Sequence, residues 1–238
     1  MGFRSQAFFY KDLYKHWLRS KFSNSYAETY DNSKQIPKTI HYAWFGHGEK
    51  NEILKKCLAT WPQQLKDYNI VLWDEKNFPF EKYPFAQQAY EQKKWAFVAD
   101  VARLHAIYYY GGIYMDTDVE VLKPFDDLLN CDAFACYETP NLITIGTLGA
   151  KPKHPWVGLI LLWYQGLNMS KNYNEIANTR IISRMMRLHY KVKLNGKEMV
   201  FADGVHLYPR EYFCPDKEHG VWKTSEDTYC IHHFTGLW

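Results

Sequence analysis

The chain has few cysteines, and they follow no pattern that would build a structural framework. Five cysteines occur among 238 residues, an odd number, and no two of them are spaced as Cys-x-x-Cys. Disulfide frameworks and four-thiolate zinc sites usually need an even count or such paired spacing. Neither is therefore expected, and reduced thiols in a cytosolic protein are predicted.

Long hydrophobic runs are also missing. No apolar stretch approaches the ~20 residues that a membrane-spanning helix requires, and the longest one, residues 156–164, is interpreted as a buried helix. The N-terminus lacks the continuous apolar core and small-residue cleavage site of a secretory signal. A cytoplasmic location is therefore predicted.

Neither sign of charge dominates. The 29 Lys and Arg residues against 26 Asp and Glu residues give a net charge of +3, which is too little to predict a nucleic-acid partner. Hydrophobic residues make up 47% and charged residues 23%, as in ordinary globular proteins, which excludes a disordered chain. Aromatic residues are plentiful at 18%, and such side chains fill cores or stack on flat rings and sugar faces.

Residues 1–35 differ from the rest of the chain. Phe9, Leu13 and Trp17 recur every four residues, which places them on one face of a helix, and basic residues lie between them. We interpret 1–35 as a helical extension and linker, separate from a main domain at 36–238. This basic amphipathic helix either packs on the main domain, which is the favoured interpretation, or makes peripheral contact with the inner face of a membrane.

From residue 36 onward, strands alternate with helices. The predicted strands are 39–45, 69–73, 113–115, 119–122, 133–137, 142–148, 205–208 and 228–234. The predicted helices are 51–61, which stops before Pro62, 94–110, which stops at Gly111-Gly112, 155–167 and 177–190. This alternation predicts an α/β domain with a mainly parallel sheet covered on both faces, and ligands at the carboxyl ends of its strands.

The sharpest local motif is Tyr114-Met115-Asp116-Thr117-Asp118. Residues i and i+2 of an extended chain point the same way, so both carboxylates are expected to face one point after a short strand. Like charges that close repel each other unless a proton or a cation intervenes, and hard oxygen ligands favour Mg²⁺, Mn²⁺ or Ca²⁺. Because Asp-x-Asp also arises by chance in turns, the motif alone does not establish a metal site.

The helix before this motif carries a second charged pair. Asp100 and Arg103 are three residues apart, so they share one helix face. If the two side chains were exposed, they would form an ordinary surface ion pair with little effect on stability. However, the residues between 95 and 104 are otherwise apolar, and burying charge is costly without partners. A ligand-facing role is therefore favoured.

Three segments together resemble a known family. Residues 36–46, 95–118 and 229–238 resemble the opening strand, the central helix-Gly-Gly-strand-Asp-x-Asp block and the closing His-His…Trp segment of sugar-binding-region glycosyltransferases with a DXD motif. Bacterial capsule and exopolysaccharide enzymes are the nearest relatives by this resemblance. Clostridial glucosylating toxin domains and initiating α-1,6-mannosyltransferases are more distant. The resemblance implies a GT-A type fold, Rossmann-like, with helices flanking the sheet.

The resemblance also implies a binding site for a sugar nucleotide. Trp44 would stack on the nucleotide base, and Tyr114 would line the same pocket. Asp100 and Arg103 would bind the donor sugar, and Asp116 would contact the ribose as well as a metal ion.

The metal ion implied by the resemblance is Mn²⁺ or Mg²⁺. Its predicted ligands are Asp116, Asp118 and one of the two neighbouring histidines, His232 or His233, between which the sequence does not choose. Trp238 would approach the diphosphate and the breaking bond. The predicted catalytic residues are Asp100, Arg103, Asp118 and Trp238.

Two positions depart from the family pattern. Leu237 stands where many relatives have a serine whose hydroxyl helps to bind the metal. One of the two histidines is therefore expected to bind the metal instead. The strand at 144–147 lacks the asparagine that many relatives carry there. The acceptor side of the pocket is therefore expected to differ.

The resemblance implies retaining transfer of a hexose from a UDP-sugar to a carbohydrate acceptor, in capsule, exopolysaccharide or lipid-linked glycan synthesis. No side chain stands out as a covalent nucleophile, and Asp100 and Glu138 are the candidates to test. One alternative is a toxin-like or effector transferase that modifies a protein, which is disfavoured because little sequence lies beyond the core. Another is a non-catalytic sugar-nucleotide-binding module. A two-metal phosphohydrolase would need more clustered carboxylates and histidines.

Overall fold

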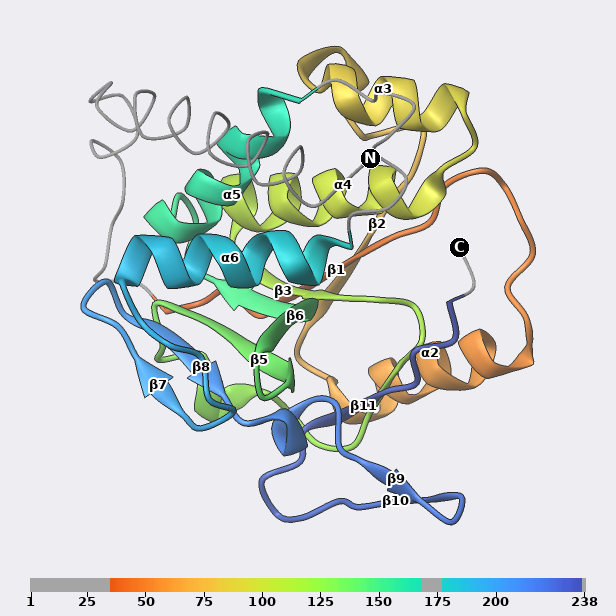
Figure 1. Ribbon diagram of the computed structural model, residues 1–238. Coiled ribbons are helices and arrows are strands. Elements are labelled where there is room, and N and C mark those ends of the chain that lie inside the picture. The colour runs from red at the N-terminus through yellow and green to blue at the C-terminus, as the bar shows by residue number, and fades with distance from the viewer. Residues whose placement is uncertain (1–34, 168–176, 237–238) are drawn as a thin grey trace.

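The structure is a computed structural model that describes residues 35–167 and 177–236 (Figure 1). The helix and linker predicted before residue 35, and Trp238, lie outside the described residues. Within the described part, no helix is both long and apolar enough to cross a membrane. The predicted boundary between residues 35 and 36 stays a prediction.

A mixed sheet of seven strands forms the centre of the described chain, in the order β2-β1-β3-β6-β5-β8-β7. Its strands are β1 (Thr39–Ala43), β2 (Asn69–Trp73), β3 (Gly112–Met115), β5 (Ala133–Thr139), β6 (Leu142–Ala150), β7 (Met199–Val200) and β8 (Val205–Tyr208). β1 runs parallel to β2 and β3, and β5 runs parallel to β8. β6 runs antiparallel to both β3 and β5, and β7 runs antiparallel to β8.

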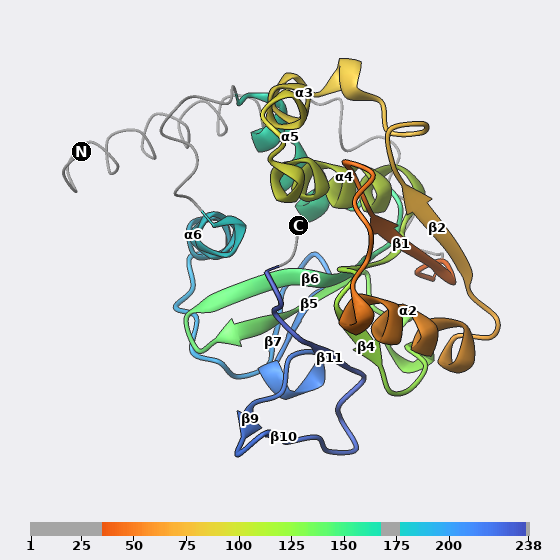
Figure 2. The same cartoon turned by 90° about the vertical axis from the view of Figure 1, so that its right-hand side faces the viewer.

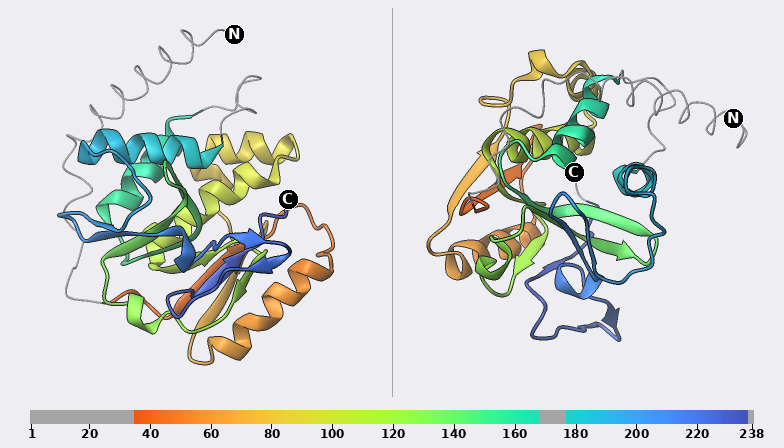
Figure 3. Two further views of the ribbon diagram at one scale, coloured as in Figure 1. Left: turned by 60° about the horizontal axis from the view of Figure 1, so that its bottom comes forward. Right: turned by 90° about the vertical axis from the view of Figure 1, so that its left-hand side faces the viewer.

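Helices cover both faces of this sheet (Figure 2). One face carries α3 (Pro84–Glu91), α4 (Trp95–Tyr110), α5 (Pro155–Gln165) and α6 (Asn178–Tyr190). The other carries α2 (Glu52–Gln64), which packs on a small sheet of β4 (Val119–Val121) and β11 (Cys230–His232), as Figure 3 also shows. The buried residues accordingly form two hydrophobic clusters. The predicted α/β class is confirmed.

Helix α4 is buried along most of its length and leads directly into β3. Gly111 ends the helix with a φ of 66°, a conformation that glycine adopts at no steric cost. A Cβ at this position would lie only 2.6 Å from Pro152 Cδ. The predicted stop is therefore confirmed. The buried residues of the helix include the charged Asp100 and Arg103.

The prediction that the helix at 51–61 stops before Pro62 is wrong. α2 continues to Gln64 with Pro62 inside it, and the Leu65 N–H still donates to the Trp61 carbonyl at 2.8 Å. Proline costs the helix one hydrogen bond. The buried Trp61 indole compensates, because it packs against β4 and donates to the Val119 carbonyl at 2.8 Å. Tertiary packing outweighs the local preference here.

Several short elements have no predicted counterpart. They include α3, which begins at Pro84, and the two-residue strands β7, β9 (Lys217–Glu218) and β10 (Val221–Trp222). A strand of two residues contains a single repeat of apolar and polar alternation, so no periodic pattern marks it.

Candidate active site

Asp116 follows the last residue of β3 and is held in place by the neighbouring strand. Its N–H donates to the Gly146 carbonyl at 2.8 Å, and its own carbonyl accepts from the Val119 N–H at 3.1 Å. Gly146 leaves no room for a side chain, because a Cβ there would lie 2.5 Å from His232 Cε1 and 2.9 Å from Asp116 Oδ2. The glycine therefore lets Asp116 and His232 lie close to β6 together.

Arg103 links α4 to the Asp-x-Asp loop. Its Nη2 donates to Asp116 Oδ1 at 2.9 Å and lies 3.4 Å from Asp100 Oδ1, while Nη1 donates to the Ile145 carbonyl at 2.9 Å. The guanidinium lies over the Tyr114 ring, 4.7 Å from its centre. Burial alone would lower the pKa of Arg103, but the carboxylate of Asp116 holds it above its ordinary value. The group is therefore a buried, charged network, as the apolar neighbours predict.

Asp100 is held by side chains from three helices. Asn178 Nδ2 donates to its Oδ1 at 2.5 Å, the Tyr164 hydroxyl donates to its Oδ2 at 3.5 Å, and Arg103 lies beside it. Burial raises the pKa of Asp100, and these three partners oppose that rise. Both oxygens are engaged, so a donor sugar would have to share Asp100 with these partners or displace them.

Asp118 is engaged from two sides by the C-terminal segment. Its Oδ1 lies 3.1 Å from His232 Nε2. Its Oδ2 accepts two hydrogen bonds from Thr235, from the N–H at 2.8 Å and from Oγ1 at 3.0 Å. Burial opposes ionisation, but these partners outweigh it and lower the pKa of Asp118 to about 2. The carboxylate is therefore ionised at neutral pH.

His232 completes a group of three possible metal ligands. Its Nε2 lies 3.8 Å from Asp116 Oδ2 and 3.1 Å from Asp118 Oδ1. Burial alone would lower the pKa of His232, but these two carboxylates raise it above the ordinary value. Its Nδ1 is buried and has no hydrogen-bond partner among the described residues. The ring is also stacked on Phe234, with the centres 4.0 Å apart.

The donor set fits a divalent cation. One ligand atom each from Asp116, Asp118 and His232 lies within 4.8 Å of the other two. Arg103 takes one oxygen of Asp116 and Thr235 takes one oxygen of Asp118, so the second oxygen of each carboxylate faces His232. Two carboxylate oxygens and one imidazole nitrogen suit Mn²⁺, and Mg²⁺ less well because it prefers oxygen. A cation would displace the imidazole proton when it binds.

His233 does not join this group. Its Nε2 lies 2.9 Å from Glu120 Oε2, and its backbone N–H donates to the Asp118 carbonyl at 3.0 Å. Of the two histidines between which the sequence does not choose, the structure places His232 beside both carboxylates and gives the His233 ring a different partner.

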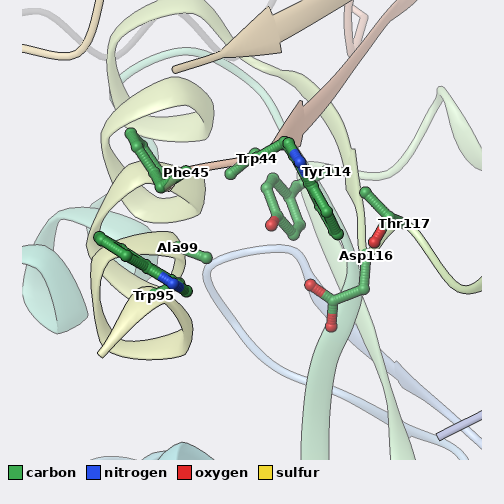
Figure 4. Close-up of a pocket in the computed structure, with 8 residues that line it drawn as sticks. Trp44, Phe45, Trp95, Ala99, Tyr114, Asp116 and Thr117 are labelled. Carbon is green, nitrogen blue, oxygen red and sulfur yellow. The ribbon is translucent and has the colours of Figure 1, made fainter. Parts of the chain in front are cut away.

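A pocket adjoins the carboxylates on the side of α4. Figure 4 shows Trp95 and Ala99 of α4 on one side of it and Trp44 and Asp116 on the other. Its lining residues are Ala43, Trp44, Phe45, Trp95, Ala99, Tyr114, Asp116 and Thr117. Trp44 is half-buried, and its Nε1 donates to the Gly48 carbonyl at 2.7 Å. The predicted base-stacking residue and the predicted metal ligand Asp116 therefore line one pocket.

The structure brings together most of the predicted site residues, except that His233 is turned away and Trp238 lies outside the described residues. It also adds residues that sequence reasoning missed. Tyr164 and Asn178 hold Asp100, and Thr235 holds Asp118. These contacts join positions 64 to 117 residues apart, so no local spacing could have revealed them.

A comparison with protein families agrees with this geometry. Residues 51–135 match the family described as "Glycosyltransferase sugar-binding region containing DXD motif". The matched segment contains Asp100, Arg103, Asp116 and Asp118. The match covers 85 of the 238 residues, so the chain is similar to this DXD glycosyltransferase family over its central segment.

Curated proteins similar to this chain include fungal and viral ones. Inositol phosphoceramide mannosyltransferase 3 of Schizosaccharomyces pombe is 33% identical over 142 residues, which cover 55% of this chain and 38% of that protein. Mannosyl phosphorylinositol ceramide synthase SUR1 of Saccharomyces cerevisiae is 32% identical over 147 residues, covering 59% and 36%. Uncharacterized glycosyltransferase L373 of Acanthamoeba polyphaga mimivirus is 29% identical over 218 residues, covering 85% and 84%. The chain thus spans less than half the length of these two fungal relatives.

Among solved structures, the PaToxG glycosyltransferase superposes with a TM-score of 0.51. It is 17% identical in sequence, and the match covers 76% of this chain and 78% of that one. At this identity the likeness concerns the fold alone. The predicted GT-A type of fold is confirmed by it.

Proposed function

We propose that this chain is a metal-dependent, retaining glycosyltransferase that moves a hexose from a nucleoside diphosphate sugar to a hydroxyl group of a glycan or lipid-linked acceptor. The observation that carries the proposal is the buried group of Asp116, Asp118 and His232 beside the pocket that contains Trp44. Asp116 belongs to both the group and the pocket. A nucleotide whose base stacks on Trp44 would therefore extend its diphosphate toward the carboxylates.

Each residue of the site has a proposed role that follows from its chemistry. Asp116, Asp118 and His232 would hold Mn²⁺ or Mg²⁺, which supplies Lewis-acid stabilisation of the negative charge on the leaving diphosphate. Burial raises the pKa of Asp116, and Arg103 opposes that rise and fixes the orientation of the carboxylate. Asp100 and Arg103 lie side by side next to the pocket residue Ala99, where they would meet the hydroxyl groups of the donor sugar.

The anomeric bond breaks as its electron pair leaves with the diphosphate. In the proposed retaining reaction, the acceptor hydroxyl attacks from the face that the diphosphate leaves, and the diphosphate takes its proton. A covalent intermediate on Asp100 is disfavoured, because Arg103, Asn178 and Tyr164 already engage both of its oxygens. Glu138 on β5 is half-buried, and burial raises the pKa of its carboxyl group. It remains the second candidate nucleophile.

The names of the relatives support part of the proposed substrate class. The fungal relatives are named for mannosyl transfer and for inositol phosphoceramide, which supports a hexose donor and a lipid acceptor. Uridine as the nucleoside and a role in polysaccharide synthesis stay predictions. We also propose the cytoplasmic location. For residues 1–35, packing of the helix on the main domain stays the favoured interpretation, and peripheral membrane contact stays the alternative.

The test is a screen of nucleotide sugars with the full chain. UDP-glucose, UDP-galactose, UDP-N-acetylglucosamine and GDP-mannose are each incubated with Mn²⁺ or with EDTA, and nucleoside diphosphate release is measured. We expect metal-dependent release from one of them. The Asp118→Asn variant should reduce the rate at least ~10–100-fold, since even changes outside the metal's own ligands cost that much. Asp67→Asn, an exposed carboxylate away from the site, is the matched control.

Two outcomes would contradict the proposal. Tight joint binding of Mn²⁺ and nucleotide without release from any donor would indicate a non-catalytic binding module. A product with an inverted anomeric centre, detected by nuclear magnetic resonance, would refute the retaining stereochemistry while leaving the transferase activity in place.

A further inference from the structure

Thr235 reaches the Asp118 carboxylate from the side opposite His232. Its N–H lies 2.8 Å and its Oγ1 lies 3.0 Å from Asp118 Oδ2, while His232 Nε2 lies 3.1 Å from Oδ1. Both donors of Thr235 therefore converge on one oxygen. The other oxygen is left facing the imidazole and, beyond it, Asp116.

The segment that carries Thr235 is anchored at several points. The His232 N–H donates to the Phe213 carbonyl at 3.1 Å, and the His233 N–H donates to the Asp118 carbonyl at 3.0 Å. Strand β11, which ends at His232, pairs with β4 directly after the Asp-x-Asp loop. Thr235 is therefore presented to Asp118 by a backbone that is already bonded to the same loop.

The loop itself does not provide these donors to Asp118. The backbone contacts of Asp116 run to β6 and to Val119, and its carboxylate is held by Arg103. Asp118 Oδ2, in contrast, accepts hydrogen bonds from the N–H and the hydroxyl of Thr235, 117 residues away. Without the threonine hydroxyl, the carboxylate would keep one donor on Oδ2 and could turn about its last bond.

We propose that Thr235 is a positioning residue that holds Asp118 with Oδ1 directed toward the cation site, so that the hydrogen bonds from Thr235 to Asp118 and the binding of a cation favour each other. This inference rests on the proposed metal-dependent function. It concerns the orientation of a ligand, so Thr235 itself need not touch the cation or the substrate. A cation that holds Asp118 should in turn favour the conformation in which Thr235 is bound to it.

The test compares Thr235→Val, which keeps the side-chain shape and removes the hydroxyl, with Thr235→Ser, which keeps the hydroxyl. Mn²⁺ binding is measured by electron paramagnetic resonance of the free ion, without nucleotide and again with UDP. We expect the Kd for Mn²⁺ to rise about tenfold or more in Thr235→Val, as for other residues that orient metal ligands. Thr235→Ser should stay within about twofold of the unchanged protein.

A second readout separates positioning from a general loss of structure. Mn²⁺ should raise the thermal unfolding midpoint of the unchanged protein and of Thr235→Ser, since a ligand that binds the native state stabilises it. Thr235→Val should need about tenfold more Mn²⁺ for the same rise. Thr235→Ala removes the same hydroxyl and replaces Thr235→Val if that variant does not fold.

The possible failures are distinguishable. If Thr235→Val binds Mn²⁺ as well as the unchanged protein while Asp118→Asn does not bind it, the positioning role is refuted and the proposed function stands. If Thr235→Ser is as weak as Thr235→Val, the hydroxyl is not what matters and the inference is also refuted. If the unchanged protein binds no Mn²⁺ even with UDP, the metal-dependent function is wrong and the inference with it.

Discussion

Arg103 and Asp116 form a buried ion pair in which Nη2 lies 2.9 Å from Oδ1, with the side chains 2% and 4% exposed. The two residues come from different elements, helix α4 and the loop after β3. Because Arg103 uses one oxygen of Asp116, the other is left facing His232. This contact therefore couples the packing of the helix to the geometry of the candidate cation site.

Replacing Arg103 by methionine should destabilise the fold strongly. The change leaves the carboxylates of Asp100 and Asp116 buried without the guanidinium that pairs with them. Removing one partner of a buried ion pair typically costs about 3–5 kcal/mol. Urea unfolding at neutral pH measures the loss. Arg103→Lys keeps the charge but cannot bond both Asp116 and the Ile145 carbonyl in the same way, so an intermediate loss is expected. A loss below about 1 kcal/mol for Arg103→Met would mean that the pair behaves like an exposed one.

Adding one methyl group at Gly146 should disturb the cation site. The new Cβ would lie 2.5 Å from His232 Cε1 and 2.9 Å from Asp116 Oδ2, so both groups must move. We expect Gly146→Ala to lose about 1–3 kcal/mol of stability and to bind Mn²⁺ more weakly. Gly48→Ala is the control, because a Cβ there meets nothing within 4 Å. Equal Mn²⁺ affinities in the two variants would contradict the tight approach at β6.

The stability of the protein should fall in mild acid because of His41. Its Nε2–H donates to the Gly111 carbonyl at 2.9 Å, and its Nδ1 accepts from Trp73 Nε1 at 3.1 Å, so a second proton has no acceptor. Burial lowers the pKa of His41 to about 4, against 6.5 for the free side chain. Between these values the unfolded chain binds the proton more readily, so stability falls as the pH falls, by about 2 kcal/mol from pH 7 to pH 5.

Urea unfolding across this pH range tests the assignment to His41. His41→Gln keeps a donor and an acceptor and should flatten the pH dependence, with a remainder from His105, whose pKa burial also lowers to about 4. The exposed His47 is the control position, and His47→Gln should leave the profile unchanged. An unaltered acid slope in His41→Gln would refute this explanation.

Truncating Trp44 should weaken nucleotide binding more than folding. The side chain is half-buried at the pocket, with Lys50 Nζ 4.5 Å from its ring centre. Stacking of a base on an aromatic ring contributes roughly 1–3 kcal/mol, so Trp44→Ala should raise the Kd for the bound nucleotide about tenfold or more. Calorimetric titration with UDP and with GDP, in the presence of Mn²⁺, measures the change. Trp44→Phe should retain most of the affinity, and an unchanged Kd in Trp44→Ala would place the base elsewhere.

Much of the secondary structure follows from local sequence patterns. The bounds predicted for the strands at 69–73 and 205–208 are those observed for β2 and β8. The Gly111-Gly112 stop also lies where expected. Pro62 shows the limit of such reasoning, because the burial of Trp61 against β4 keeps α2 helical through a residue that usually ends a helix.

The choice between His232 and His233 shows what the sequence leaves open. Successive side chains of a strand point to opposite faces, so only one of the two can meet the carboxylates. The pairing of β11 with β4, which sets His232 opposite Val119, decides which one it is. That register depends on how two segments more than a hundred residues apart come together.

The amino-acid sequence by itself determined the α/β class, the paired carboxylates of Asp116 and Asp118, and the shared helix face of Asp100 and Arg103. Each of these depends on residues a few positions apart, where helix and strand periodicity operate. The tertiary structure alone decided the antiparallel direction of β6, the place of His232, and the contacts of Tyr164, Asn178 and Thr235 with the buried carboxylates. These features depend on how distant segments pack and pair, which no local pattern of residues specifies.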